Sequence, residues 1–158
     1  MDSYSFLDHA NIYLGGFFIK NDFLLNKSSS QILLGVKDSL LMFESKQCRI
    51  QIYLEHYRVY NEISILNTND PNHWYNIDAM ACFVSGTSPS IWIYNLPRGI
   101  PTSQVIEQQL ARWQTILDSN FDKIMPLFVS EDKYYETQEA LDKFTQNFYS
   151  EQKRLSPK

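Results

Sequence analysis

The stretch RIQIYLEHYRVYNEISIL, residues 49–66, decides the fold because apolar and polar side chains alternate along it. Apolar side chains fall at even positions up to Leu54 and at odd positions from Tyr57 onward. A period of two is typical of a strand with one face in a core. The change of parity near Glu55 and His56 predicts a bulge or a tight turn between two strand segments.

Further strands are predicted on both sides of this stretch. Residues 12–19 are apolar and aromatic, with a bend at Gly15–Gly16, and residues 67–73 have the composition of a loop. Residues 74–85 and 90–94 predict two more strands, joined by a short connection that suits a hairpin. Consecutive strands with short connections indicate an antiparallel sheet.

Residues 30–44 fit two structures. Ile32, Val36, Leu40 and Phe43 recur at helical spacing after a serine run that can cap a helix. Gly35 counts against a helix, and the apolar residues extend almost all round its surface. A pair of strands over residues 31–44 is the alternative.

The C-terminal half predicts helices. Residues 103–118 carry an apolar stripe of Ile106, Leu110, Trp113 and Leu117, opposite a polar face. Residues 121–129, interrupted by a proline, predict a short helical turn and an extended link. A last helix is expected from residue 130 to residue 154, with acidic side chains at its start and basic ones at its end, as the helix dipole favours.

These elements predict one α+β domain over residues 1–158. We expect an antiparallel sheet of four to six strands with two or three helices packed on one face. Residues 11–95 would be mostly sheet, with the possible helix at 30–44, and residues 102–154 would be helical.

The residues that usually carry catalysis or bind metals do not stand at the required spacings. A zinc site would need ligands in close pairs, whereas Cys48, His56, His73 and Cys82 are each isolated in the sequence. Gly15–Gly16 is not followed by the helix start of a phosphate-binding loop. We therefore expect a protein that is not an enzyme and that uses no cofactor or metal.

Charge and hydropathy narrow the choice of partners. The formal net charge is −4, and residues 118–142 hold seven acidic side chains against two lysines. A continuous basic stripe is missing, so we expect no nucleic acid partner. The longest apolar run, residues 12–19, is far shorter than the roughly 20 residues of a membrane helix, and the first eight residues lack a basic segment for export. A cytoplasmic protein without membrane contact is expected.

Aromatic side chains make up 15% of the chain, and several stand beside carboxylates. Aromatic residues are enriched at protein interfaces because they offer large, rigid contact areas. Three such clusters occur, around residues 55–62, residues 70–75 and residues 131–136. The candidate partner-binding residues are Glu55, Tyr57, Tyr60, Glu62, Asp70, Trp74, Tyr75, Glu131, Asp132, Tyr134, Tyr135 and Glu136.

The leading hypothesis is a protein-binding domain that covers a basic partner, most concretely a bacterial immunity protein or an antitoxin-like inhibitor of a toxin or nuclease. A first alternative is a small-molecule-binding or enzymatic domain with an apolar pocket lined by Phe83, Trp92, Tyr94 and Trp113. A second alternative is a secretion chaperone or adaptor.

Overall fold

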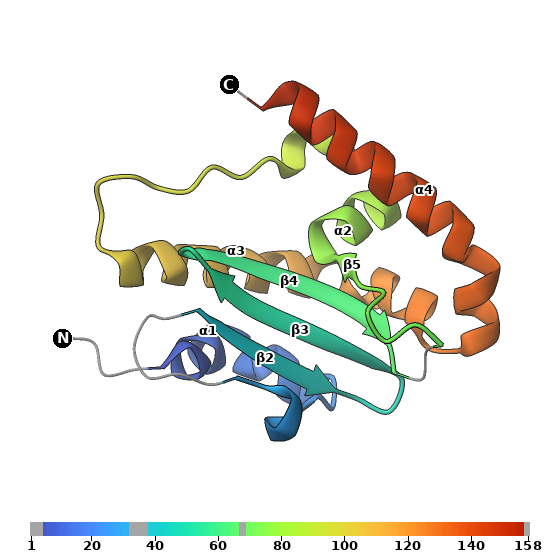
Figure 1. Cartoon of the computed structure of the whole chain (residues 1–158), viewed down its shortest axis with the longest axis horizontal. Coiled ribbons are helices and arrows are strands. Elements are labelled where there is room, and N and C mark those ends of the chain that lie inside the picture. The colour runs from blue at the N-terminus through green and yellow to red at the C-terminus, as the bar shows by residue number, and fades with distance from the viewer. Residues whose placement is uncertain (1–4, 32–37, 67–68, 157–158) are drawn as a thin grey trace.

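A computed structural model describes residues 5–31, 38–66 and 69–156, and it shows an antiparallel sheet with helices (Figure 1). Within these ranges the five strands follow one another across the sheet in chain order. The strands are β1 (Leu24–Leu25), β2 (Ser39–Glu44), β3 (Cys48–Glu55), β4 (Arg58–Ile65) and β5 (Tyr75–Asn76). The helices are α1 (Phe6–Lys20), α2 (Ile77–Ser85), α3 (Thr102–Ile124) and α4 (Glu131–Leu155), with short 3-10 turns η1 (Lys27–Ser29), η2 (Pro89–Trp92) and η3 (Met125–Phe128).

The long hairpin β3–β4 forms the centre of the sheet. His56 and Tyr57 connect its strands, and both have positive φ angles, 48° and 66°, as a type I′ turn requires. Neither residue favours that conformation, and contacts from outside the hairpin support the turn. The backbone N–H of His56 donates to Asp38 Oδ1 at 3.1 Å, and Gln109 Nε2 donates to the carbonyl of Tyr57 at 2.7 Å. The tight turn predicted from the parity change is confirmed.

One face of the sheet is covered by α1 and α3, which lie side by side behind the strands in Figure 1. Phenylalanines join the layers: Phe18 stacks on Phe43 of β2 with ring centroids 3.8 Å apart, and Phe17 meets Phe121 of α3 edge to face at 4.8 Å. The isoleucines and leucines of β3 that point to this side are buried. This layer is therefore the hydrophobic core.

The other face of the sheet, called here the open face, points toward the viewer in Figure 1, with α4 beside the β4–β5 edge. By the strand register this face carries the side chains of Leu40, Met42, Glu44, Arg49, Gln51, Tyr53, Glu55, Arg58, Tyr60, Glu62 and Ser64. Met42 and Ser64 are buried, Glu55 is exposed and the others are half-buried. The two faces of the same strands therefore differ in both cover and chemistry.

Residues 12–19, predicted to be a strand, belong to helix α1, so that prediction was wrong. The helix begins upstream, where Ser5 and Asp8 form a reciprocal capping box. From there Ala10, Leu14 and Phe18 recur at helical spacing and are buried. The glycine pair led to the wrong assignment, but this helix tolerates it.

The prediction of a strand over residues 74–85 was also wrong. Only Tyr75 and Asn76 pair with β4, and helix α2 follows them. The side chain of Asn76 accepts hydrogen bonds from the N–H groups of Asp78 and Ala79 and starts the helix. Gly86, with φ 66°, ends it. Residues 90–94, predicted to be a strand, contain the 3-10 turn η2 instead.

The remaining elements follow the sequence more closely. Residues 39–44 form strand β2, so a helix over 30–44 is wrong there, while residues 32–37 lie outside the described residues. The helices predicted over 103–118 and 130–154 are confirmed as α3 and α4, and α3 extends six residues further, to Ile124. The α+β class, the antiparallel sheet and the helical C-terminal half are confirmed.

Candidate functional site

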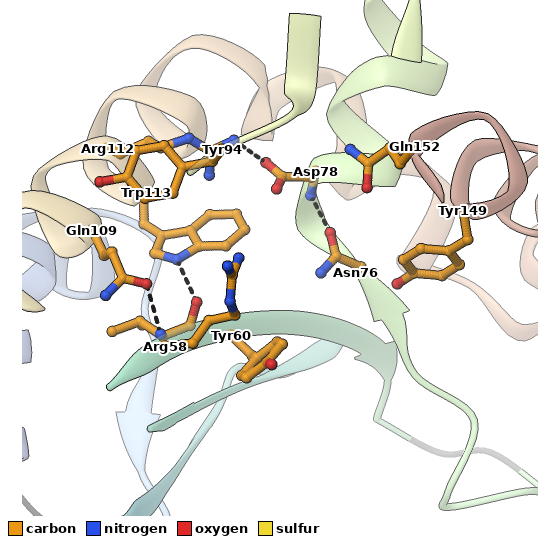
Figure 2. Close-up of a pocket in the computed structure, with 11 residues that line it drawn as sticks. Arg58, Tyr60, Asn76, Asp78, Tyr94, Gln109, Arg112, Trp113, Tyr149 and Gln152 are labelled. Carbon is orange, nitrogen blue, oxygen red and sulfur yellow. Dashed lines mark hydrogen bonds and ion pairs between the residues drawn. The ribbon is translucent and has the colours of Figure 1, made fainter. Parts of the chain in front are cut away.

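Helix α3 closes part of the free edge of β4 with side chains instead of a strand. Gln109 Oε1 accepts from the N–H of Val59 at 2.9 Å, and Trp113 Nε1 donates to the carbonyl of the same residue at 3.3 Å (Figure 2). Because β5 pairs only with Glu62 and Ile63, this end of β4 would otherwise leave its backbone groups unpaired. The contact places α3 against β4 and shapes the space beside it.

That space is a cavity of about 140 Å³ between β4, α2, α3 and α4, with charged, amide and aromatic side chains in its lining. Figure 2 shows its walls. The residues lining it are Arg58, Val59, Tyr60, Asn76, Asp78, Tyr94, Gln109, Arg112, Trp113, Tyr149 and Gln152. They come from five separate segments of the chain, so the cavity exists only in the folded protein.

Arg112 is held in place on one side of the cavity. One of its terminal nitrogens lies 2.9 Å from Asp78 Oδ1, and its guanidinium lies 4.9 Å from the ring centroid of Tyr94 and 5.2 Å from that of Trp113. Burial raises the pKa of the Asp78 carboxyl, and the charge and hydrogen bond of Arg112 oppose that shift. Arg112 is therefore already paired with Asp78 in the wall of the cavity.

Arg58 is different, because its guanidinium has no hydrogen-bond or ion-pair partner among residues 5–31, 38–66 and 69–156. The residue is half-buried, and Figure 2 shows its side chain rising from the strand into the cavity. Its strand neighbour across the hairpin is Glu55, which is exposed. A half-buried arginine without a partner is a group available to a ligand.

The open face continues from Arg58 along the strands. Tyr53 and Tyr60 stack across β3 and β4 with ring centroids 4.7 Å apart. Glu62 accepts hydrogen bonds from Gln51 and Tyr53, yet burial raises the pKa of its carboxyl above the ordinary value. This face therefore combines aromatic area with a desolvated acid.

The loop over residues 69–76 packs against α4. The backbone N–H of Asn69 donates to the hydroxyl of Tyr135 at 3.2 Å. Asp142 accepts from the Tyr75 hydroxyl at 2.5 Å and lies 2.9 Å from Nε2 of His73. Two of the aromatic and acidic clusters predicted from the sequence, residues 70–75 and 131–136, are thereby brought together.

We call the exposed part of this junction the acidic end; it consists of Asp70, Glu131, Asp132, Tyr135 and Glu136. It borders the open face through Trp74, whose ring lies 4.4 Å from the guanidinium carbon of Arg49 on β3. The third cluster lies apart from it: Glu55 and Tyr57 are exposed at the β3–β4 turn, and Tyr60 and Glu62 are half-buried on the open face.

Two predicted partner-binding residues are placed in the core. Tyr75 and Tyr134 are 1% and 0% exposed, and both pack against Phe128 with ring centroids 5.8 Å apart. Their side chains therefore do not contribute to the surface, although their neighbours Trp74 and Tyr135 are accessible. Neighbouring side chains on a helix or strand point to different faces, one toward the core and one toward solvent. Residues that are close in the sequence are therefore not all exposed.

The sequence did not single out Arg58, Asp78 or Arg112. They lie on β4, α2 and α3, so no short sequence motif contains them. In the sequence alone, an arginine on the polar face of a strand that binds a ligand looks the same as one that points into solvent. The alternative apolar pocket is partly present, because Tyr94 and Trp113 line the cavity, whereas Phe83 packs against Phe144 at 5.1 Å. The lining is mixed: aromatic rings share it with Arg58, Asp78 and Arg112, which the expected apolar pocket did not include.

The described residues contain no group of three or more His, Cys, Asp or Glu side chains arranged to hold a metal ion. Cys48 and Cys82 are buried free thiols, and burial raises the pKa of Cys48 to about 11, which disfavours the reactive thiolate. In the part of the chain that the structure describes, no helix has both the length and the apolar character to cross a bilayer. Comparisons with protein-family models, curated proteins and solved structures give no match to this chain.

Proposed function

We propose that this chain is a non-enzymatic protein-binding domain that engages a basic partner through the acidic end and the adjoining open face. In its most concrete form it is an immunity protein or antitoxin-like inhibitor that neutralises a basic toxin or nuclease. Acidic side chains take the places of phosphates on such a partner, and aromatic side chains supply the contact area.

The observation that carries this proposal is the convergence of two sequence clusters at the junction of the 69–76 loop and α4. The Asn69–Tyr135 hydrogen bond joins them, and Asp142 anchors His73 and Tyr75 beneath. As a result Asp70, Asp132 and Glu136 are exposed on a supported surface. Carboxylates on a supported backbone lose less entropy on binding than carboxylates on a mobile loop.

Charge within the acidic end favours a cation. Glu131, Asp132 and Glu136 are exposed in the first two turns of α4, where Lys133 is the basic residue among them. The exposed fraction of Tyr135 is 38%, which leaves ring area beside these carboxylates. A partner with lysines and arginines around an apolar patch would complement both features.

Two matched charge reversals test the proposal. D132K/E136K changes two exposed carboxylates four residues apart on α4, and D118K/D122K does the same on α3, at residues that are not part of the acidic end. Each variant and the wild type serve as bait for proteins of the source cell and for the product of the adjacent gene, since immunity proteins are encoded beside their toxins.

We expect one basic protein to bind the wild type and D118K/D122K in equimolar amounts and to bind D132K/E136K at least about tenfold more weakly. The complex should abolish the toxic activity of that partner. Equal binding to all three baits, or recovery of no basic protein, would contradict the proposal.

A further inference from the structure

We propose that the cavity beside Arg58 binds a small organic monocarboxylate, with the ligand's carboxylate paired to the Arg58 guanidinium and its body against Tyr60, Tyr94 and Tyr149. The site lies between the C-terminal half of α4 and the hairpin end of β4. Arg58 and Tyr60 also belong to the open face, but the acidic end is at the opposite end of α4, and the inference does not rest on the proposed function.

The state of the two arginines decides where the anion binds. Arg112 already pairs with Asp78 at 2.9 Å and lies against two aromatic rings, whereas Arg58 has no partner for its guanidinium among the described residues. A guanidinium presents two parallel N–H groups that match the two oxygens of a carboxylate. Because Arg58 is half-buried, such a pair would be less screened by water than one on an open surface.

The charge balance of the cavity selects a single negative charge. Its charged lining residues are Arg58, Arg112 and Asp78, which leaves one positive charge in excess inside a chain of net charge −4. A second negative charge on the ligand would meet the Asp78 carboxylate. A carboxylate therefore suits the site better than a dianionic phosphate.

The walls set the size and polarity of the ligand. A cavity of about 140 Å³ is close to the roughly 150 Å³ that holds a benzene molecule in an engineered protein core. Three tyrosine rings supply flat contact area. Asn76 uses its side-chain oxygen to cap α2, so its NH₂ group remains as a donor, and Gln152 adds a second amide.

The test uses benzoate as the probe in titration calorimetry on the full chain. R58Q removes the proposed ligand group, and R98Q is the matched control, because Arg98 is exposed and does not line this cavity. Since neither arginine has a partner in the described structure, both variants should keep the circular dichroism and melting temperature of the wild type.

We expect saturable benzoate binding by the wild type and R98Q, and at least about tenfold weaker binding by R58Q. Inorganic phosphate should compete poorly. Absence of saturable binding in the wild type, equal affinity in R58Q, or phosphate that competes as well as benzoate would each overturn the assignment.

A second variant tests the charge argument. Replacing Asp78 by Asn keeps the size of the side chain and removes the negative charge that repels a dianion. D78N should therefore bind inorganic phosphate more tightly than the wild type does, by at least about tenfold. An unchanged or weaker phosphate affinity in folded D78N would contradict the role given to Asp78.

Discussion

The two faces of the sheet are built from the same strands but carry different kinds of side chain. The covered face joins Ile50, Ile52 and Phe43 to the phenylalanines of α1 and α3, and these side chains are almost completely buried. The open face carries the Tyr53–Tyr60 stack and the partly desolvated Glu62. Alternation in one strand pair thus separates a face that is buried in the core from a face whose aromatic and polar side chains are mostly half-buried.

The largest effect should come from truncating an aromatic side chain on the covered face. Phe43→Ala removes a ring stacked on Phe18 at 3.8 Å and should lower the free energy of unfolding by about 3–5 kcal/mol. On the open face, Tyr60→Ala should lower the free energy of unfolding by about 1 kcal/mol, because the remaining ring of its partner Tyr53 is already partly in contact with water. Urea denaturation measures both, and equal losses would remove the distinction between the faces.

The next effect concerns the edge where the two faces meet. Gln109 is 3% exposed and bonds to the backbone of Val59 and Tyr57. Gln109→Leu leaves these groups unpaired and should lower the free energy of unfolding by about 1–3 kcal/mol. Gln108→Leu, on the exposed side of the same helix, is the control and should change it by less than about 0.5 kcal/mol. Similar values for the two variants would show that α3 does not support the edge.

A smaller effect is expected from Glu62, and it depends on pH. The pKa of this carboxyl is raised in the folded chain, so the folded state binds a proton more tightly than the unfolded state does. Stability from this group is present below the ordinary pKa of 4.5 and is lost as pH rises through the folded pKa. Glu62→Gln should therefore be more stable than the wild type at neutral pH.

That advantage should vanish in acid, where the wild-type carboxyl is protonated. Denaturation curves at several pH values measure the difference, with Glu55→Gln as the control, because Glu55 is exposed on the same face. A gain from Glu62→Gln that persists at low pH would contradict the desolvation argument.

The sequence predicted what depends on a long, regular pattern. The β3–β4 hairpin, α3 and α4 follow from alternation, helical periodicity and caps over many residues. Helices α1 and α2 were mistaken for strands because apolar side chains lie on most sides of each helix. Buried residues such as Phe18 and Met80 therefore do not stand out at a helical period in the sequence. The length of each apolar segment and the capping residues Ser5 and Asn76 are the sequence signals that could have identified these helices.

The candidate sites divide in the same way. Exposed acidic residues such as Asp132 and Glu136 on a predicted helix were found from the sequence. The burial of Tyr75 and Tyr134 was not, because it depends on the 69–76 loop folding onto α4. The cavity around Arg58 is assembled from distant segments, and only tertiary structure unites them.

The central claim is that charge on the acidic end brings a basic partner to this side of the sheet. Its most direct test is the association rate of the co-purified partner, measured at increasing salt concentration for the wild type and D132K/E136K. We predict that the wild-type rate falls steeply with salt while its dissociation rate changes little, and that the variant shows a slower rate with a shallower dependence. Association rates that are independent of salt, or identical dependences for the two proteins, would contradict the claim.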